Sequence, residues 1–147
     1  MSYRNAALSK PLPSNPPRVN PPRVLLVGRD LHEGERVRRL LSYGRAAAQV
    51  AVCSSPCDAR RAVAAHGAPD VLVLEDRAWP AVDAEALAEL RQLCRPRARR
   101  TGLILSRRWG ELHQGERVPE GVPVVERPYR LDELVPALQL VMLRSRA

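Results

Sequence analysis

The chain has 147 residues, which is the length of a single domain. It carries 24 basic and 16 acidic residues, a formal net charge of +8, and all but one of the basic residues are arginine. No apolar run approaches the roughly 20 residues that span a bilayer, and the N-terminus lacks the apolar stretch of a secretory signal. We therefore expect a cytoplasmic protein without membrane insertion, whose excess positive charge favours anionic partners.

Residues 1–22 are rich in Pro, Ser, Asn and Arg and contain little that could be buried. This composition predicts a disordered tail, followed by one domain at residues 23–147. The domain contains no Phe, so its core must be built from Leu, Val, Ile and Ala. We expect Cys53, Cys57 and Cys94 to be small buried apolar residues, because three cysteines make neither a disulfide framework nor a metal site.

Short apolar runs alternate with segments of helical periodicity from residue 23 onward. The runs are typical of strands buried on both faces; in chain order they are residues 24–27, 49–52, 71–74, 102–105 and 122–125. The helical segments, also in chain order, are residues 31–43, 56–66, 84–94 and 131–143. Residues 107–121 contain glycines and a proline, so a fourth helix between the last two strands would be irregular.

Individual residues mark the ends of these helices. Ser55 is placed to cap the second helix and Asp83 the third, while Gly44 and Gly67 are placed to end the first and second. Pro136 should kink the last helix because proline removes a backbone hydrogen bond.

This alternation predicts an α/β fold with a five-stranded parallel sheet, doubly wound by helices on both faces. Ligands bind such sheets at the carboxyl ends of the strands. The candidate site is therefore made of the residues that directly follow the strands: Gly28, Arg29, Asp30, Glu75, Asp76, Ser106, Arg127 and Pro128.

Four segments at these strand ends carry a family resemblance. They are RVLLVGRD at 23–30, PDVLVLED at 69–76, LILS at 103–106 and ERPY at 126–129. In order and spacing they resemble the receiver domain of bacterial response regulators, which has a flavodoxin-like fold. Ser106 follows Asp76 by 30 residues and precedes Arg127 by 21, as in the family's layout.

The resemblance implies a phosphorylation switch. In the family, an acidic pair after the first strand binds Mg²⁺, and an Asp after the third strand accepts the phosphoryl group. A hydroxyl after the fourth strand and a Lys-Pro-aromatic sequence after the fifth then bind the phosphate. An anionic nucleophile needs cations between it and an anionic phosphoryl group.

This sequence departs from the family where the acidic pair should stand. That pair falls on Gly28 and Arg29, which leaves only Asp30 nearby, whereas Mg²⁺ prefers several oxygen ligands. We expect Arg29 to point inward and, together with Arg127, to form an ion-pair cluster with Glu75 or Asp76.

The position of the phospho-acceptor is open between two carboxylates. Counting forward from Pro69-Asp70 gives Glu75, whereas counting from Pro80, or back from Ser106, gives Asp76. We favour Asp76. A Glu at this position would be a poor acceptor, and its fixed charge would imitate the activated state.

The resemblance also implies a phosphate pocket formed by Ser106, Arg127, Pro128 and Tyr129. In it, Arg127 replaces the family's Lys. The family's Lys-Pro bond is often cis, whereas X–Pro bonds in general are mostly trans, so both forms of the Arg127–Pro128 bond stay open.

Three functions follow. The first is a stand-alone pseudo-receiver, neither an enzyme nor dependent on a cofactor, which binds a signalling protein independently of phosphorylation. Its binding face would be the last helix and residues 107–130, with Trp109 and Tyr129 as contacts. The second is a working phospho-receiver of a two-component phosphorelay, with Asp76 as acceptor, Mg²⁺ on Asp30 and a histidine kinase as partner.

The third is a nucleic-acid-binding protein, because arginines cluster beside the fourth strand. They are Arg95, Arg97, Arg99, Arg100, Arg107 and Arg108. No stacking aromatics accompany them, which favours an ordinary solvated surface. A homodimer remains open in all three cases.

Overall fold

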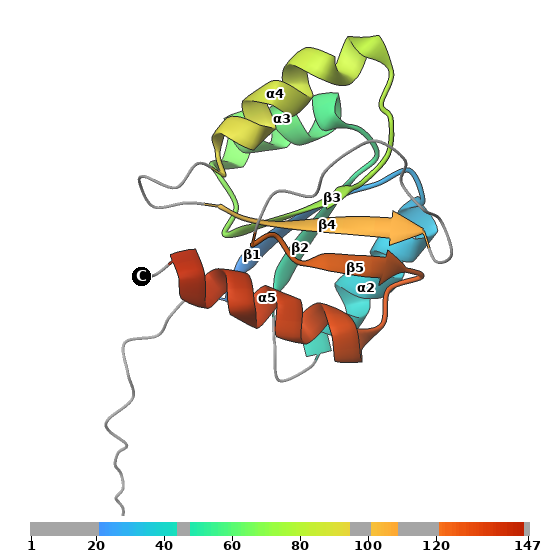
Figure 1. Cartoon of the computed structure of the whole chain (residues 1–147), viewed down its shortest axis with the longest axis vertical. Coiled ribbons are helices and arrows are strands. Elements are labelled where there is room, and N and C mark those ends of the chain that lie inside the picture. The colour runs from blue at the N-terminus through green and yellow to red at the C-terminus, as the bar shows by residue number, and fades with distance from the viewer. Residues whose placement is uncertain (1–20, 44–47, 95–100, 109–120, 146–147) are drawn as a thin grey trace, which may run out of the picture.

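The computed structural model describes residues 21–43, 48–94, 101–108 and 121–145 (Figure 1). Its strands are β1 (Arg23–Val27), β2 (Gln49–Cys53), β3 (Val71–Glu75), β4 (Gly102–Arg108) and β5 (Val124–Arg127). Its helices are α2 (Leu31–Tyr43), α3 (Pro56–His66), α4 (Ala84–Gln92) and α5 (Leu131–Ser145), with a short 3-10 turn, η1 (Ala81–Asp83), before α4. Within these ranges no helix is both long and apolar enough to cross a membrane.

The five strands form one parallel sheet in the order β2-β1-β3-β4-β5. This is the strand order of flavodoxin-like folds, and it confirms the predicted α/β class. Because every pairing is parallel, the carboxyl ends of the strands lie at one edge of the sheet. The register there pairs Glu75 with Ser106 and Arg108 with Arg127.

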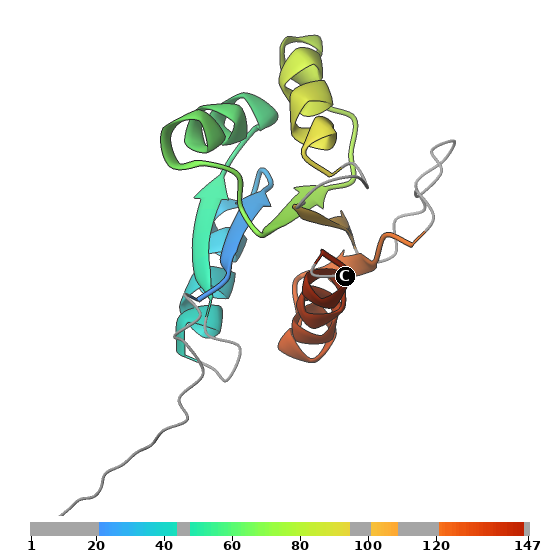
Figure 2. The ribbon, with the colours of Figure 1, turned by 90° about the vertical axis from the view of Figure 1, so that its left-hand side faces the viewer.

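Helices cover both faces of the sheet (Figure 2). Side chains alternate along each strand, so each strand contributes to two apolar clusters. Val73, Ile104 and Val125 pack under α2 and α5, whereas Leu72, Leu74 and Leu105 pack under α3 and α4. Aliphatic side chains thus fill both layers, as the absence of Phe requires.

Two of the predicted helix ends are confirmed at α3. The Ser55 hydroxyl oxygen accepts a hydrogen bond from the backbone N–H of Asp58 at 3.2 Å. Gly67 ends the helix with a φ of 87°, a conformation that favours glycine. Gly44 and residues 109–120, most of the segment 107–121 in which an irregular helix was expected, lie outside the described residues, whereas Arg107 and Arg108 continue β4.

Some predicted details were wrong. Asp83 stands before α4, but its carboxylate makes no cap there and instead accepts a hydrogen bond from the N–H of Cys57 in α3 at 3.2 Å. The last strand starts at Val124, after Pro123, which has no N–H to donate to a ladder. The three cysteines are half-buried rather than buried.

Gly34 sets the distance between α2 and the sheet. It is buried, and a Cβ atom at this position would lie 2.5 Å from Cγ1 of Val52 in β2. The side chain of Val52 is β-branched and has little freedom to move away.

We predict that Gly34→Ala destabilises the protein by about 1–2 kcal/mol, because overpacking outweighs the better helix propensity of Ala. Chemical denaturation measures this change. Val52→Ala should relieve the clash, so the double variant should lose less stability than the sum of the two single variants. Strict additivity would contradict the assigned contact.

Candidate functional site

Glu75 is the last residue of β3, and its carboxylate is buried at the carboxyl edge of the sheet. Its side chain is 5% exposed, and Nη1 of Arg127 lies 3.2 Å from its Oε2. Nη1 of Arg77 lies 3.6 Å from Oε1. The backbone N–H of Arg29 donates to Oε2 at 3.1 Å. Two guanidinium groups and a backbone amide thus surround this carboxylate.

Ser106 and Tyr129 form a second buried contact beside Glu75. The Tyr129 hydroxyl donates to Oγ of Ser106 at 2.9 Å, and both residues are buried. Burial raises the pKa of Tyr129 to about 12, so the phenol stays a donor at neutral pH. The neighbouring Arg127–Pro128 peptide bond is cis, and Pro128 itself is exposed.

Asp76 points to a different partner. Nε of Arg107 in β4 donates to its Oδ2 at 3.0 Å, while its backbone N–H donates to the carbonyl of Ser106 at 2.6 Å. Glu75 shares a face of the sheet with Val73, as Ser106 does with Ile104. The geometry therefore favours Glu75 over Asp76 for the position beside Ser106 and Arg127.

The expected inward position of Arg29 was wrong. Its side chain is exposed and forms no ion pair with any residue that the structure describes; only its backbone N–H reaches Glu75. Side chains alternate along an extended segment, and the short Gly28 leaves its space to Oε2 of Glu75. A Cβ atom at Gly28 would lie 2.7 Å from that oxygen.

Asp30 serves the start of α2. It is exposed, and its Oδ1 accepts a hydrogen bond from the backbone N–H of Glu33 at 3.0 Å. This is the geometry of a helix N-cap, in which a short carboxylate satisfies a free backbone donor.

The magnesium site of the receiver resemblance does not fit these residues. Of the described His, Cys, Asp and Glu side chains, no three come together as a group that could hold a metal ion. Gly28 offers no ligand, Asp30 caps a helix, and the charge of Glu75 is already matched by arginine.

A clamp between α2 and the start of α5 was not anticipated from the sequence. Oε1 of Glu33 accepts hydrogen bonds from the backbone N–H of Tyr129 at 2.6 Å and from Nη2 of Arg36 at 2.9 Å. Arg36 Nη2 also donates to the carbonyl of Tyr129. The two ends of the clamp are 96 residues apart, so local sequence held no signal of the contact.

The clamp sets the titration of Glu33. Burial alone would raise the pKa of this carboxyl, but hydrogen bonds from Arg36 and from the backbone of Tyr129 outweigh burial, so its pKa is lowered. Glu33 is thus a charged structural acceptor at neutral pH.

Of the six arginines that the sequence offered for binding nucleic acid, two lie among the residues that the structure describes. Arg107 is half-buried and paired with Asp76, and Arg108 is exposed. Arg95, Arg97, Arg99, Arg100 and the predicted contact Trp109 lie outside the described residues. Tyr129 is too deeply buried to be a contact for a partner.

Comparisons with known proteins identify the fold. No family model matches the chain, and no curated protein matches it. A response regulator receiver domain protein from Clostridium thermocellum matches with a TM-score of 0.65 and 16% identity, over 85% of this chain and 97% of that chain.

Two further solved structures agree. The signal receiver domain of an HD domain-containing protein from Pseudomonas fluorescens Pf-5 matches with a TM-score of 0.63 and 21% identity, over 85% of this chain and 97% of that chain. The CheY-like receiver domain from Methylobacillus flagellatus matches with a TM-score of 0.61 and 20% identity, over 82% and 98%. The chain therefore has the fold of response regulator receiver domains.

We predict that Glu75→Gln destabilises the protein by about 3 kcal/mol, because it leaves the guanidinium of Arg127 without its counter-charge. Thermal or chemical denaturation measures the loss. Asp132→Asn is the matched control, because Asp132 and Arg130 form an exposed pair at 2.6 Å; it should cost no more than about 0.5 kcal/mol. Equal losses in the two variants would show that burial of the Glu75 pair has no energetic consequence.

A second prediction concerns acid pH. Because the pKa of Glu33 is below its ordinary 4.5 in the folded protein, its contribution to stability is complete above that pH and is lost as the pH falls through the folded value. Glu33→Gln should therefore be less stable than the natural protein at about pH 6, and this difference should shrink at about pH 3. Urea denaturation at both pH values tests it, with the exposed Glu35→Gln as control; a difference that does not change with pH would contradict the prediction.

Proposed function

We propose that this chain is an atypical receiver that acts in the cytoplasm as a protein-interaction module in signalling, without catalysis and without phosphorylation. One observation carries the proposal: the buried carboxylate of Glu75 is already bound by Arg127 and by the N–H of Arg29. In the receiver family, the corresponding place belongs to the acceptor and its phosphoryl group.

The space around Glu75 supports this interpretation. The cavity between Gly28, Glu75, Arg127 and Tyr129 measures about 10 Å³, at most enough for a single water molecule. A phosphoryl group would need the Glu75 pair to open. The side chain of Glu is also one methylene longer than that of Asp, so its negative charge lies further out and closer to where a phosphate would sit.

The other groups that would bind a phosphate in the family also bind partners within this protein. The hydroxyl of Ser106, which would bind a phosphate oxygen in the family, holds the phenol of Tyr129. The Glu33 clamp binds the backbone of the same tyrosine. These contacts hold one arrangement of the β5–α5 connection, so we propose a constitutive binding surface.

We place that surface on α5. Three leucines on this helix are exposed, Leu131 at 39%, Leu140 at 41% and Leu143 at 67%. Leu140 and Leu143 are three residues apart and therefore lie side by side on one face of the helix, whereas Leu131 lies on another face. The pair of exposed leucines is suited to a protein partner. We propose that the partner that binds this surface is a signalling protein.

We predict that incubation with Mg²⁺ and acetyl phosphate gives no phosphoryl adduct on this protein, measured by intact mass. An ordinary receiver labelled in parallel shows that the reagent works. An adduct that disappears in Asp76→Asn would instead establish the working phospho-receiver and overturn the proposal.

A rebuilt variant makes the test two-sided. The triple change Gly28→Asp, Arg29→Asp and Glu75→Asp restores the family's acidic pair and acceptor, and we expect it to acquire the adduct and to bind Mg²⁺. The same triple change with Glu75→Asn in place of Glu75→Asp has an equally short side chain at position 75 but no acceptor carboxylate, so it is the matched control and should stay unlabelled. Labelling of this control would show that position 75 is not where the phosphoryl group is attached.

A further inference from the structure

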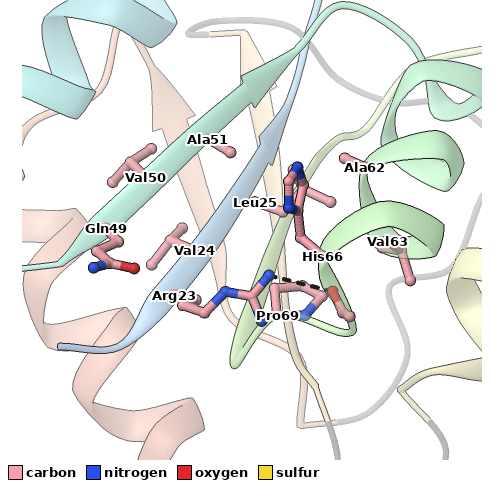
Figure 3. A pocket seen from close by; sticks show the side chains of 11 residues that line it. Arg23, Val24, Leu25, Gln49, Val50, Ala51, Ala62, Val63, His66 and Pro69 are labelled. Atoms are coloured by element: carbon pink, nitrogen blue, oxygen red, sulfur yellow. Dashed lines mark hydrogen bonds between the residues drawn. The ribbon is translucent and has the colours of Figure 1, made fainter. Parts of the chain in front are cut away.

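A hollow lies at the end of the sheet opposite the Glu75 pair, between α3 and the first residues of β1 and β2 (Figure 3). Its volume is about 550 Å³, which is within the usual range of small-molecule sites. We call it the α3 hollow. Its apolar lining is Leu25, Ala51, Ala62, Val63 and Pro69, and its polar side chains are Arg23, Gln49 and His66.

Small side chains explain why this space is open. The register pairs Leu25 with Ala51, so both face α3 from neighbouring strands. Opposite them α3 presents Ala62 and Val63, which are only half-buried although they pack against the apolar cluster under α3 and α4. The apolar surface that the described residues leave uncovered in the hollow comes mainly from Ala51, Ala62 and Val63, whereas Leu25 is buried. Burial of such a surface drives binding.

The ionisable side chains that line the hollow are basic. Arg23 and His66 are its only basic or titratable groups, and no carboxylate lines the hollow among the described residues. The guanidinium of Arg23 donates to the carbonyls of Gly67 and Ala68, each at 3.3 Å. A guanidinium has five N–H donors, so others remain for a ligand.

The carboxylate of Asp70 binds the backbone of Arg23 and not its guanidinium. Oδ2 of Asp70 accepts from the backbone N–H of Arg23 at 2.8 Å, and Arg23 forms no ion pair with any described side chain. The hollow thus combines an apolar floor with a guanidinium at its rim that forms no ion pair within the part of the chain that the structure describes.

We propose that the α3 hollow binds a small amphipathic carboxylate. Its hydrocarbon part would lie on Ala51, Ala62 and Val63, and its carboxylate would bind the guanidinium of Arg23. The site is at the opposite end of the strands from the Glu75 pair and does not depend on the function proposed above.

Decanoate is a suitable probe, with decanol as its uncharged counterpart. Titration of the full chain, followed by two-dimensional amide NMR, should give saturable shifts confined to residues that line the hollow. No saturable shifts there, or shifts spread over α5 instead, would overturn the proposal. Shifts at the hollow that appear on raising the protein concentration without ligand would show that a second copy covers it, which would also overturn the proposal.

Two pairs of variants test the geometry. Ala62→Leu fills the hollow and should weaken decanoate binding about tenfold, whereas Ala65→Leu, on the exposed side of the same helix, should not. Arg23→Gln should weaken decanoate binding about threefold to fivefold and leave decanol binding unchanged. The control for lost charge is Arg61→Gln, because Arg61 is exposed and paired with Asp58. An equal effect of the two arginine variants on decanoate binding would overturn the assigned site. An equal effect of the two alanine variants would do the same.

Discussion

The carboxyl edge of the sheet is organised around one buried ion pair, that of Glu75 with Arg127. A carboxylate in a protein interior is costly unless cationic or N–H donors replace its water. Those donors come from β5, from the loop after β3 and from the backbone after β1. The charge of Glu75 can be satisfied only when these segments meet, and the central place of β3 in the sheet allows this.

A chain of hydrogen bonds, some of them to charged groups, connects the same edge of the sheet to α2. Oγ of Ser106 accepts a hydrogen bond from the phenol of Tyr129. The carboxylate of Glu33 accepts hydrogen bonds from the backbone N–H of Tyr129 and from the side chain of Arg36. Ser106, Tyr129, Glu33 and Arg36 each have a hydrogen-bond partner within this series, and such satisfied contacts make this part of the protein rigid. The β5–α5 connection is thereby fixed from the sheet and from α2 together.

The fold was predictable from the sequence because its signals are local. Apolar runs marked the strands, and Ser55 and Gly67 marked the ends of α3 through contacts within a few residues. The site was predictable only as a set of strand-end residues. Which of Glu75 and Asp76 faces Arg127 depends on the alternation of side chains along β3, and the strand's last residue cannot be fixed by counting.

Other errors had a common cause in long-range contacts. Asp83 has the sequence position of a cap, yet its carboxylate satisfies a donor 26 residues away in α3. Arg29 was expected inside because it stands where the family has its acidic pair, but the side chains that reach Glu75 are those of Arg127, which was expected there, and of Arg77, which was not. A charge-rich sequence offers many equivalent partners, and only the three-dimensional arrangement selects among them.

The absence of a side chain at Gly28 couples this position to position 75. Any larger residue there would meet Oε2 of Glu75, and an acidic one would also add a second negative charge beside it. The two positions therefore constrain each other, and the order in which they change matters. A shorter side chain at position 75 would have to come before a longer one at position 28.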